Sequence, residues 1–401
     1  MSQRVRWIAL AALMAALVAC QAPAWRNMPL QQQMPIQNWA SAPIFQGFNA
    51  PIQLGDVMVK FNNAYHELYT DNEQAGHQDP HNPDKIFVGL VQQAKKSLDI
   101  AIYDITEVSI IQALIQARQR GVRVRIVTES DSLALNGQLR PQMQAMADAG
   151  IFLRGDERTG LMHHKFMIMD GQHVITSSMN LTHNSLYRDN NNALKISSPQ
   201  LAANYQAEFD RLFEQGLFGP GGKDVPFPVV KVDGASIQTY FSPRGGTKQA
   251  ILETLGRARQ SIRFAVFSVT DKDIQQMLVR KAREGLAIEG IFDGCMISQY
   301  SIYQELLTKN IPVMIDGNQA LLHSKTFIVD RRVVITGSYN FSMSAEERNN
   351  ENTLIIQSPK IAAAYEQEHE RLKRASVQNN PPPYDNRACS SQVIDDDINP
   401  I

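Results

Sequence analysis

The chain has 401 residues, of which 43 % are apolar and 20 % are charged, a composition typical of globular rather than disordered chains. This length accommodates two or three domains of ordinary size. The formal net charge of -1 gives no global basic surplus of the kind that binds nucleic acid or an anionic membrane surface, although a local basic cleft is still possible.

The N-terminus is typical of a secretory signal. Arg4 and Arg6 precede an apolar run at 7–18, which is too short for a typical transmembrane helix. The run closes on Leu17-Val18-Ala19-Cys20, which resembles the lipobox of bacterial lipoproteins. The resemblance implies cleavage before the cysteine and acylation of its thiol, and several acyl chains anchor a protein firmly. We expect a periplasm-facing lipoprotein of the bacterial cell envelope, sorted to the outer membrane because Gln21 follows.

Two copies of one domain make up most of the remaining chain. Residues 191–212 parallel residues 351–372 at a constant offset of 160, with the same Ser-Pro pair and the same Tyr, Glu and Arg positions. Upstream, residues 97–101 parallel residues 261–265 at an offset of 164, so the first copy has four extra residues. An internal repeat of this kind determines the fold class and must be recognised first.

Strands and helices alternate within each copy. Apolar and polar residues alternate from Leu98 to Ile102, and apolar residues then recur at helical spacing over 110–117. Gly121 is placed to end that helix, and a strand follows at 122–127. The second copy repeats this order as a strand at 262–267, a helix at 274–282, Gly285 and a strand at 286–292. The pattern predicts two tandem α/β sandwich domains with mostly parallel, mixed sheets.

Composition places the boundaries between these parts. The segment 216–234 is rich in Gly and Pro, and the C-terminus holds a Pro triplet and an acidic run. We divide the chain into a signal peptide 1–19, a tether 20–54, domain 1 at 55–215, a linker 216–234, domain 2 at 235–376 and a Pro-rich acidic tail 377–401. Cys295 and Cys389 remain after lipidation of Cys20, and the sequence does not decide whether they pair.

One motif occurs in both copies. His163, Lys165 and Asp170 form His-x-Lys-(x)4-Asp, and His323, Lys325 and Asp330 repeat it; Asn180 and Asn340 follow ten residues beyond each Asp, preceded by Ser178 and Ser338. An apolar run follows each Lys and predicts a strand, so that His and Lys point to the same face. A basic nitrogen, a fixed cation and short polar groups suit attack on a phosphodiester and binding of its non-bridging oxygens.

The double motif resembles that of the phospholipase D superfamily, His-x-Lys-(x)4-Asp-(x)6-Gly-Ser-x-Asn, over roughly residues 55 to 375. The second copy matches fully, whereas Ser177 replaces the Gly in the first. The resemblance implies two copies facing each other across a pseudo-two-fold axis, one shared site and no metal or other cofactor. It also implies that one His forms a covalent phosphohistidine while the other protonates the leaving alcohol.

The resemblance also suggests roles for individual residues. We expect His163 as nucleophile, with Glu351 beside His323 and Asn191 beside His163 as the acceptors that orient each ring. Ser178, Ser338 and Asn191 are also expected to bind substrate. A carboxylate at His323 would raise its proton affinity and suit a general acid. Asp170 and Asp330 are included in the catalytic set, although hydrogen bonds that hold the motif in place are their more natural role. His164 has no counterpart in the second copy, where Ser324 stands, so we expect it to be structural or at the rim.

Fold and motif define a reaction type but not a substrate. A metal site is disfavoured, because a Lys beside the ligands repels a cation. We expect a monomer that hydrolyses a glycerophospholipid, since the anchor at Cys20 would hold it on a surface of substrate. The alternatives are a periplasmic endonuclease acting on DNA or RNA and a non-catalytic binding protein; the near-neutral charge counts against the first. The paired histidines, lysines and asparagines count against the second.

Overall fold

The computed structural model describes residues 50–62, 73–221, 224–318 and 320–379. The predicted signal peptide, Cys20, Cys389 and most of the tether and tail lie outside these ranges. Cys295 is in a disulfide, and both other cysteines of the chain are among the residues that are not described. In the described ranges, no helix is both long and apolar enough to cross a membrane.

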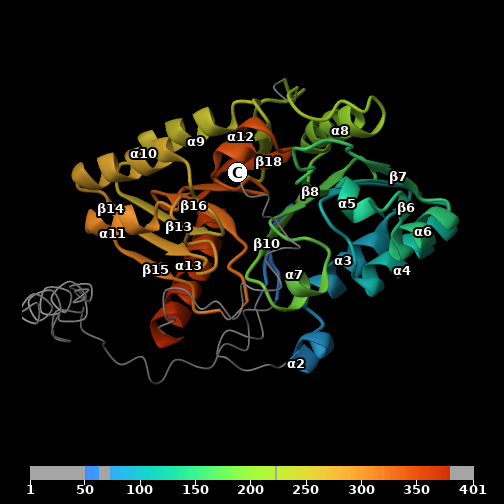
Figure 1. Ribbon diagram of the computed structural model, residues 1–401, viewed down its shortest axis with the longest axis horizontal. Coiled ribbons are helices and arrows are strands. Elements are labelled where there is room, and N and C mark those ends of the chain that lie inside the picture. Colours follow the sequence, from blue (N-terminus) through green and yellow to red (C-terminus); the bar gives the residue numbers. More distant parts are fainter. Residues whose placement is uncertain (1–49, 63–72, 222–223, 319, 380–401) are drawn as a thin grey trace, which may run out of the picture. The chain divides into compact units, whose positions relative to one another are not determined.

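Each repeat is built on one eight-stranded sheet, and the two sheets have the same strand order. Figure 1 shows the first repeat in blue to green and the second in yellow to red. The first sheet runs β1 (Ile52–Leu54), β2 (Val57–Phe61), β10 (Asn192–Ser197), β9 (His173–Ser177), β8 (Lys165–Met169), β3 (Ser97–Ile102), β4 (Arg123–Thr128), β7 (Phe152–Gly155). The second runs β11 (Val230–Val232), β12 (Ala235–Ser242), β18 (Glu351–Gln357), β17 (Val333–Gly337), β16 (Lys325–Val329), β13 (Ser261–Val266), β14 (Ala287–Phe292), β15 (Val313–Ile315). The internal repeat predicted from sequence is therefore a repeat of topology.

Helices cover both faces of each sheet. The first repeat contains α2 (Glu73–Gln78), α3 (Pro83–Gln93), α4 (Val108–Gln119), α5 (Ser130–Leu133), α6 (Pro141–Asp148), α7 (His183–Tyr187) and α8 (Pro199–Phe213), with a short hairpin of β5 (Ala134–Leu135) and β6 (Gln138–Leu139). The second contains α9 (Thr247–Gly256), α10 (Lys272–Arg283), α11 (Tyr303–Thr308), α12 (Met343–Glu347) and α13 (Pro359–Asn379). The α/β class is confirmed.

Successive residues of a strand face different cores, because side chains alternate across a sheet. On β3, Ile100 packs with α3 and α4, whereas Ala101 packs in the core that contains α8. That second core also contains α13 and apolar residues of β12 and β18 from the other repeat. The edge of Phe61 on β2 meets the ring of Tyr365 on α13 at 4.9 Å between centroids. The two repeats therefore share one core.

The sheets are mixed, but the expectation that they are mostly parallel is wrong. Only β3–β4 and β4–β7, with their counterparts in the second repeat, pair in parallel, and the other strand pairs are antiparallel. The motif strands β8 and β16 each enter a tight hairpin, in which Asp170 and Asp330 have positive φ. The strand–helix–strand pattern seen in the sequence is the parallel part, and the hairpins supply the rest.

Three boundaries differ from the predicted ones. β1 lies within the segment assigned to the tether, and β11 lies within the segment assigned to the linker. Both are three-residue edge strands, too short to show a clear alternation. Helix α13 continues to Asn379, which is beyond the predicted start of the tail.

Candidate active site

The two motifs begin two equivalent strands. His163 ends a loop and Lys165 opens β8; His323 and Lys325 stand in the same relation to β16. The backbone N–H of His163 donates to Asn350 O, and that of His323 donates to Asn190 O, each at 2.9 Å. The loop that carries each motif histidine is thus hydrogen-bonded to the residues just before β18 or β10 in the other repeat.

The side chains also cross between the repeats. His163 Nδ1 lies 2.7 Å from Glu351 Oε2, and His323 Nδ1 lies 3.1 Å from Asn191 Oδ1. Glu351 opens β18 and Asn191 immediately precedes β10, so each ring is held by a residue of the other repeat. All four side chains are buried. The crossed pairs bring both motifs to one seam.

The predicted partners of the two histidines are therefore exchanged. Glu351 contacts His163 and not His323, whereas Asn191 contacts His323 and not His163. A carboxylate beside His323 was the reason to expect this residue as the general acid. That reason no longer holds, because the carboxylate lies beside His163. The error arose because residues of one repeat were paired with the histidine of the same repeat, while the sheets dock so that the pairs cross.

The hydrogen bonds define which nitrogen of each ring carries a proton. A carboxylate only accepts, so Nδ1 of His163 donates to Glu351. Asn191 donates through Nδ2 to Ser185 O and accepts from Ser178 Oγ, so its Oδ1 faces His323 and accepts from that ring as well. In the neutral form of both rings, Nε2 then carries the lone pair, which is the arrangement a nucleophile or proton acceptor needs.

Asn180 and Asn340 have unsatisfied amide atoms. Asn180 is fully buried, yet among the described residues neither its Nδ2 nor its Oδ1 has a hydrogen-bond partner; the same is true of Asn340 Oδ1. Leaving one buried polar group unpaired costs roughly 1–3 kcal/mol, so such groups need an explanation. The Nδ2 group of Asn180 is a donor and suits an acceptor ligand such as phosphate, whereas the two Oδ1 atoms would need a donor.

Ser178 and Ser338 were expected to bind substrate, but their hydroxyls hold backbone and side chains. Ser178 Oγ accepts from Asn192 N at 3.0 Å and donates to Asn191 Oδ1 at 2.8 Å. Ser338 Oγ accepts from Asn352 N, also at 3.0 Å. Asn191, likewise expected at the substrate, orients His323 instead. These residues therefore hold the backbone and the His323 ring in position.

Two aromatic residues cover the site and were missed in the sequence. The edge of the Tyr103 ring meets His163 at 5.3 Å between centroids, and Phe267 meets His323 at 4.7 Å. The ammonium groups of Lys165 and Lys325 lie 5.3 and 4.7 Å from the same two ring centroids, distances at which a cation–π attraction operates. The two aromatics follow equivalent strands at the offset of 164, which is the signal that could have revealed them.

Asp170 and Asp330, which we had grouped with the catalytic residues, lie at the far end of the motif strands. The Asp170 carboxylate accepts backbone N–H groups of Lys95, Lys96 and Ser97. Asp330 accepts the equivalent groups at 259–261. A strand of five residues, at about 3.3 Å each or roughly 16 Å in length, lies between each aspartate and its histidine. Their role is to fix the hairpin and not to contact substrate.

His164 belongs to a buried ionic cluster. Its Nε2 lies 3.2 Å from Glu208 Oε1, and Arg211 binds the same carboxylate through two nitrogens. Charge-assisted hydrogen bonds of this kind hold the pKa of Glu208 below its usual value, against the desolvation that raises it. The structural alternative expected for His164 therefore fits its environment.

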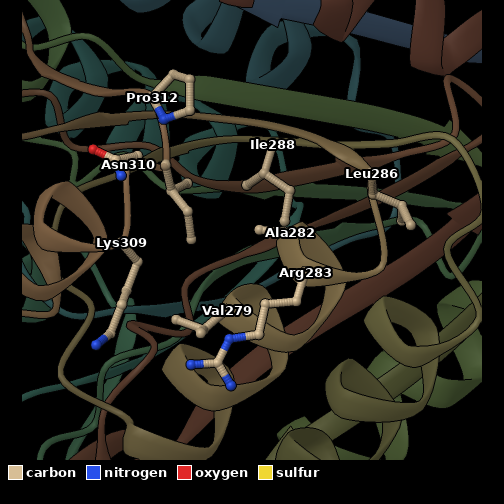
Figure 2. Close-up of a pocket in the computed structure, with 9 residues that line it drawn as sticks. Val279, Ala282, Arg283, Leu286, Ile288, Lys309, Asn310 and Pro312 are labelled. Atoms are coloured by element: carbon tan, nitrogen blue, oxygen red, sulfur yellow. The ribbon is translucent and has the colours of Figure 1, made fainter.

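A separate groove of about 270 Å³ lies at the opposite end of β14, where this strand begins (Figure 2). Arg283 and Lys309 extend beside an apolar floor that includes Val279 and Ile288. Its nine lining residues include no histidine and no carboxylate. The groove thus lacks the paired imidazoles that distinguish the histidine seam.

Sheet topology and crossed histidines define a two-repeat protein with a single composite site. A family model described as "Cardiolipin synthase, PLD-like domain" matches residues 87–213 and 251–373. The chain belongs to the phospholipase D superfamily.

Relatives and a solved structure agree with this membership. The human mitochondrial cardiolipin hydrolase is 35 % identical over 168 residues, covering 42 % of this chain and 64 % of that protein. The phospholipase D of Rickettsia prowazekii (strain Madrid E) is 30 % identical over 140 residues, covering 35 % and 68 %. The chain spans 59 to 64 % of three other mitochondrial cardiolipin hydrolases. The phosphatidylserine synthase of Haemophilus influenzae Rd KW20 shares the fold, with a TM-score of 0.60, 14 % identity and coverage of 82 % and 89 %.

Proposed function

We propose that this protein is a phosphodiesterase of the phospholipase D type that hydrolyses a glycerophospholipid to phosphatidate and head group. The observation that carries the proposal is the crossed pair of buried histidines, each oriented through its Nδ1 by a residue of the other repeat. The Nδ2 group of Asn180, a buried donor with no partner among the described residues, adds a place for a phosphate oxygen. Relatives named phospholipase D and cardiolipin hydrolase support the lipid substrate.

The reaction proceeds in two displacements at phosphorus. His163 Nε2 attacks phosphorus, and the bond to the head-group oxygen breaks as His323 transfers its Nε2 proton to that oxygen. Water then attacks phosphorus, His323 takes up its proton, and the bond to His163 breaks to release phosphatidate. Lys165 and Lys325 stabilise the charge that develops on the equatorial oxygens.

The structure changes the reason for choosing His163 as nucleophile. Phosphorylation at Nε2 while Nδ1 keeps its proton leaves a positive ring, and the Glu351 carboxylate 2.7 Å away stabilises that charge. His323 has a neutral acceptor, so its proton is held less tightly and is more easily given to a leaving group. The general acid is then the histidine with Asn191, and not the one with Glu351.

Replacing each histidine by alanine tests the shared site. His163→Ala and His323→Ala should each remove nearly all turnover of bis(p-nitrophenyl) phosphate, and the double variant should be little worse, because residues acting as a unit are non-additive. His323→Ala should still form the phosphohistidine, since p-nitrophenol leaves without protonation, and acid quench with mass spectrometry should find it on His163. His173→Ala, at the opposite end of the sheet, is the matched control.

Independent, additive losses would mean two separate sites, and an adduct on His323 would reverse the roles. The natural substrate is then identified by comparing the rates of hydrolysis of phosphatidylcholine, phosphatidylethanolamine, cardiolipin and single-stranded DNA. This experiment uses protein that lacks residues 1–20. Cleavage of DNA alone would replace the lipid proposal by the nuclease alternative.

A further inference from the structure

Each repeat contains a pair of buried carboxyl groups just behind its catalytic histidine. Glu129 follows β4 and Asp156 follows β7 in the first repeat. Asp293 follows β14 and Asp316 follows β15 in the second. All four are at most 6 % exposed, which is unusual for carboxyl groups that lack a strong ion pair.

One carboxyl of each pair binds the same backbone group. Glu129 Oε2 accepts the N–H of Met162, and Asp293 Oδ2 accepts the N–H of Leu322, both at 2.8 Å. Met162 and Leu322 are the residues immediately before His163 and His323. The same contact, formed twice at equivalent positions, ties the loop of each histidine to the edge of its own sheet.

The second carboxyl of each pair lies near the residue of the other repeat whose carbonyl accepts the backbone N–H of the histidine. Asp316 Oδ2 lies 3.4 Å from Asn190 Nδ2, and Asn190 O accepts the backbone N–H of His323. In the first repeat, Arg158 stands between the equivalent groups: its Nε lies 3.9 Å from Asp156 and its guanidinium donates to Asn350 Oδ1. The backbone at each histidine is thus held by a carboxyl of its own repeat and by an asparagine carbonyl of the other repeat.

We propose that Glu129 and Asp293 are positioning residues of the active site, each holding one catalytic histidine through the backbone N–H of the residue before it. The inference rests on the proposed function, since it concerns how that site is kept in register. A displacement of about 1 Å at a reacting group costs roughly 100-fold in rate, so losing one of the hydrogen bonds that hold the loop should slow the reaction.

Burial sets the protonation of these groups. Desolvation, with the charge of Asp156 and a smaller effect of Asp131, raises the pKa of Glu129 to about 8, and desolvation with Asp316 raises the pKa of Asp293 to about 8. Desolvation raises the pKa of Asp316 to about 7. Arg158 opposes the rise at Asp156, and Glu368 is a further carboxyl near Asp316.

These folded pKa values lie above the unfolded ones, so the stability they contribute is present at low pH and is lost as pH rises through about 8. Above that pH, two carboxylates in one dry pocket repel each other beside the histidine loop. A variant that keeps an acceptor oxygen but cannot ionise should therefore keep the loop in place and remove the alkaline loss.

The test compares Glu129→Gln, Glu129→Met and Asp293→Asn in the full-length protein. We expect Glu129→Met to lower kcat on bis(p-nitrophenyl) phosphate by about 100-fold with little change in KM. Glu129→Gln and Asp293→Asn should retain most of kcat at pH 7 and lose less melting temperature than wild type between pH 5 and pH 8. Asp99→Asn, which weakens a buried ion pair with Arg125, is the control that lowers stability without affecting kcat.

Amide hydrogen exchange supplies a readout that needs no activity. Exchange at Met162 should accelerate in Glu129→Met and stay slow in Glu129→Gln. Unchanged exchange, or unchanged kcat, in the Met variant would overturn the inference. A wild-type enzyme inactive on every phosphodiester would instead overturn the proposed function, while the exchange result would still decide whether Glu129 holds the loop.

Discussion

Glu351 and Asn191 occupy equivalent places but differ by one charge, so the two histidines they hold cannot behave alike. The carboxylate favours the positive form of its ring, whereas the amide orients the other ring without adding charge. The chemical difference between the two halves of the site therefore comes from the acceptors behind the rings, because both rings carry the same lysine two residues later.

Glu351→Gln and Asn191→Asp test this difference directly. Glu351→Gln should slow formation of the phosphohistidine by about 10- to 100-fold, a range typical for loss of a group that orients and charges a reacting histidine. Asn191→Asp should instead raise the pKa of His323 and move the alkaline limb of the pH–rate profile upward. Rapid-quench kinetics and pH profiles measure the two effects.

A different pattern would count against the role assignment. If both variants slowed the same step equally, the two acceptors would be interchangeable and the site would be functionally symmetric. Mass-spectrometric quantification of the adduct in each variant separates these outcomes, because the adduct accumulates when hydrolysis is the impaired step.

At the scale of single elements, the hairpin ends hold the motif strands in register. Three backbone N–H groups at 259–261 reach the Asp330 carboxylate, which caps the turn between β16 and β17. Asp170 forms the same arrangement between β8 and β9. Both residues adopt positive φ, at 52° and 56°, so the turn is defined by backbone conformation as well as by hydrogen bonds.

Asp330→Ala should therefore affect stability and not chemistry. We expect the free energy of unfolding to fall by about 2 kcal/mol, since three backbone N–H groups lose a charged acceptor, while kcat stays within a few-fold of wild type. Desolvation raises the pKa of Asp330, but the N–H groups outweigh it and the folded pKa is lowered. This stabilisation is present above the unfolded pKa of about 3.9 and is lost as pH falls through the folded value. Urea titrations at pH 7 and pH 3 measure both effects, and a large loss of kcat in a folded variant would contradict this role.

The features that could be predicted from sequence are those that depend on local residue patterns, namely strands, helices, the double motif and the repeat. The strand beginning near Leu98 and the helix ended by Gly121 follow from spacing alone, and they occur as β3 and α4. The double motif and the internal repeat likewise needed only the order of residues. Contacts between the repeats were beyond such reasoning, because His163 and Glu351 are separated by 188 positions and meet only when the sheets dock.

The remaining differences have physical causes of the same kind. Ser178 was assigned to phosphate because a short hydroxyl suits that ligand, yet the strand entry beside it offered a backbone N–H that needed an acceptor. Glu129 and Asp293 follow strands at equivalent positions but were not singled out, since a carboxyl after a strand is common. Their burial, and the N–H they accept, are visible only in the folded chain.

At the scale of the whole molecule, location decides which substrate the site meets. The segment Leu17-Val18-Ala19-Cys20 lies outside the described residues, and the lipid anchor remains a prediction from sequence. Cys20→Ser should abolish labelling by a radioactive fatty acid and move the protein from the membrane fraction to the soluble fraction. Equal labelling of wild type and variant would exclude an anchor at this residue, and Cys295→Ser is the control because Cys295 lies in the globular part, packed against Phe267 and Leu321.

The crossed acceptors have a consequence for the origin of the chain. In a symmetric dimer of one repeat, the same gene would place the same acceptor behind both histidines, and any change useful to one would be imposed on the other. Joining the repeats in one polypeptide lets position 191 and position 351 mutate separately. With both repeats in one polypeptide, the two histidines can have different acceptors, and here one acceptor is a carboxylate and the other an amide.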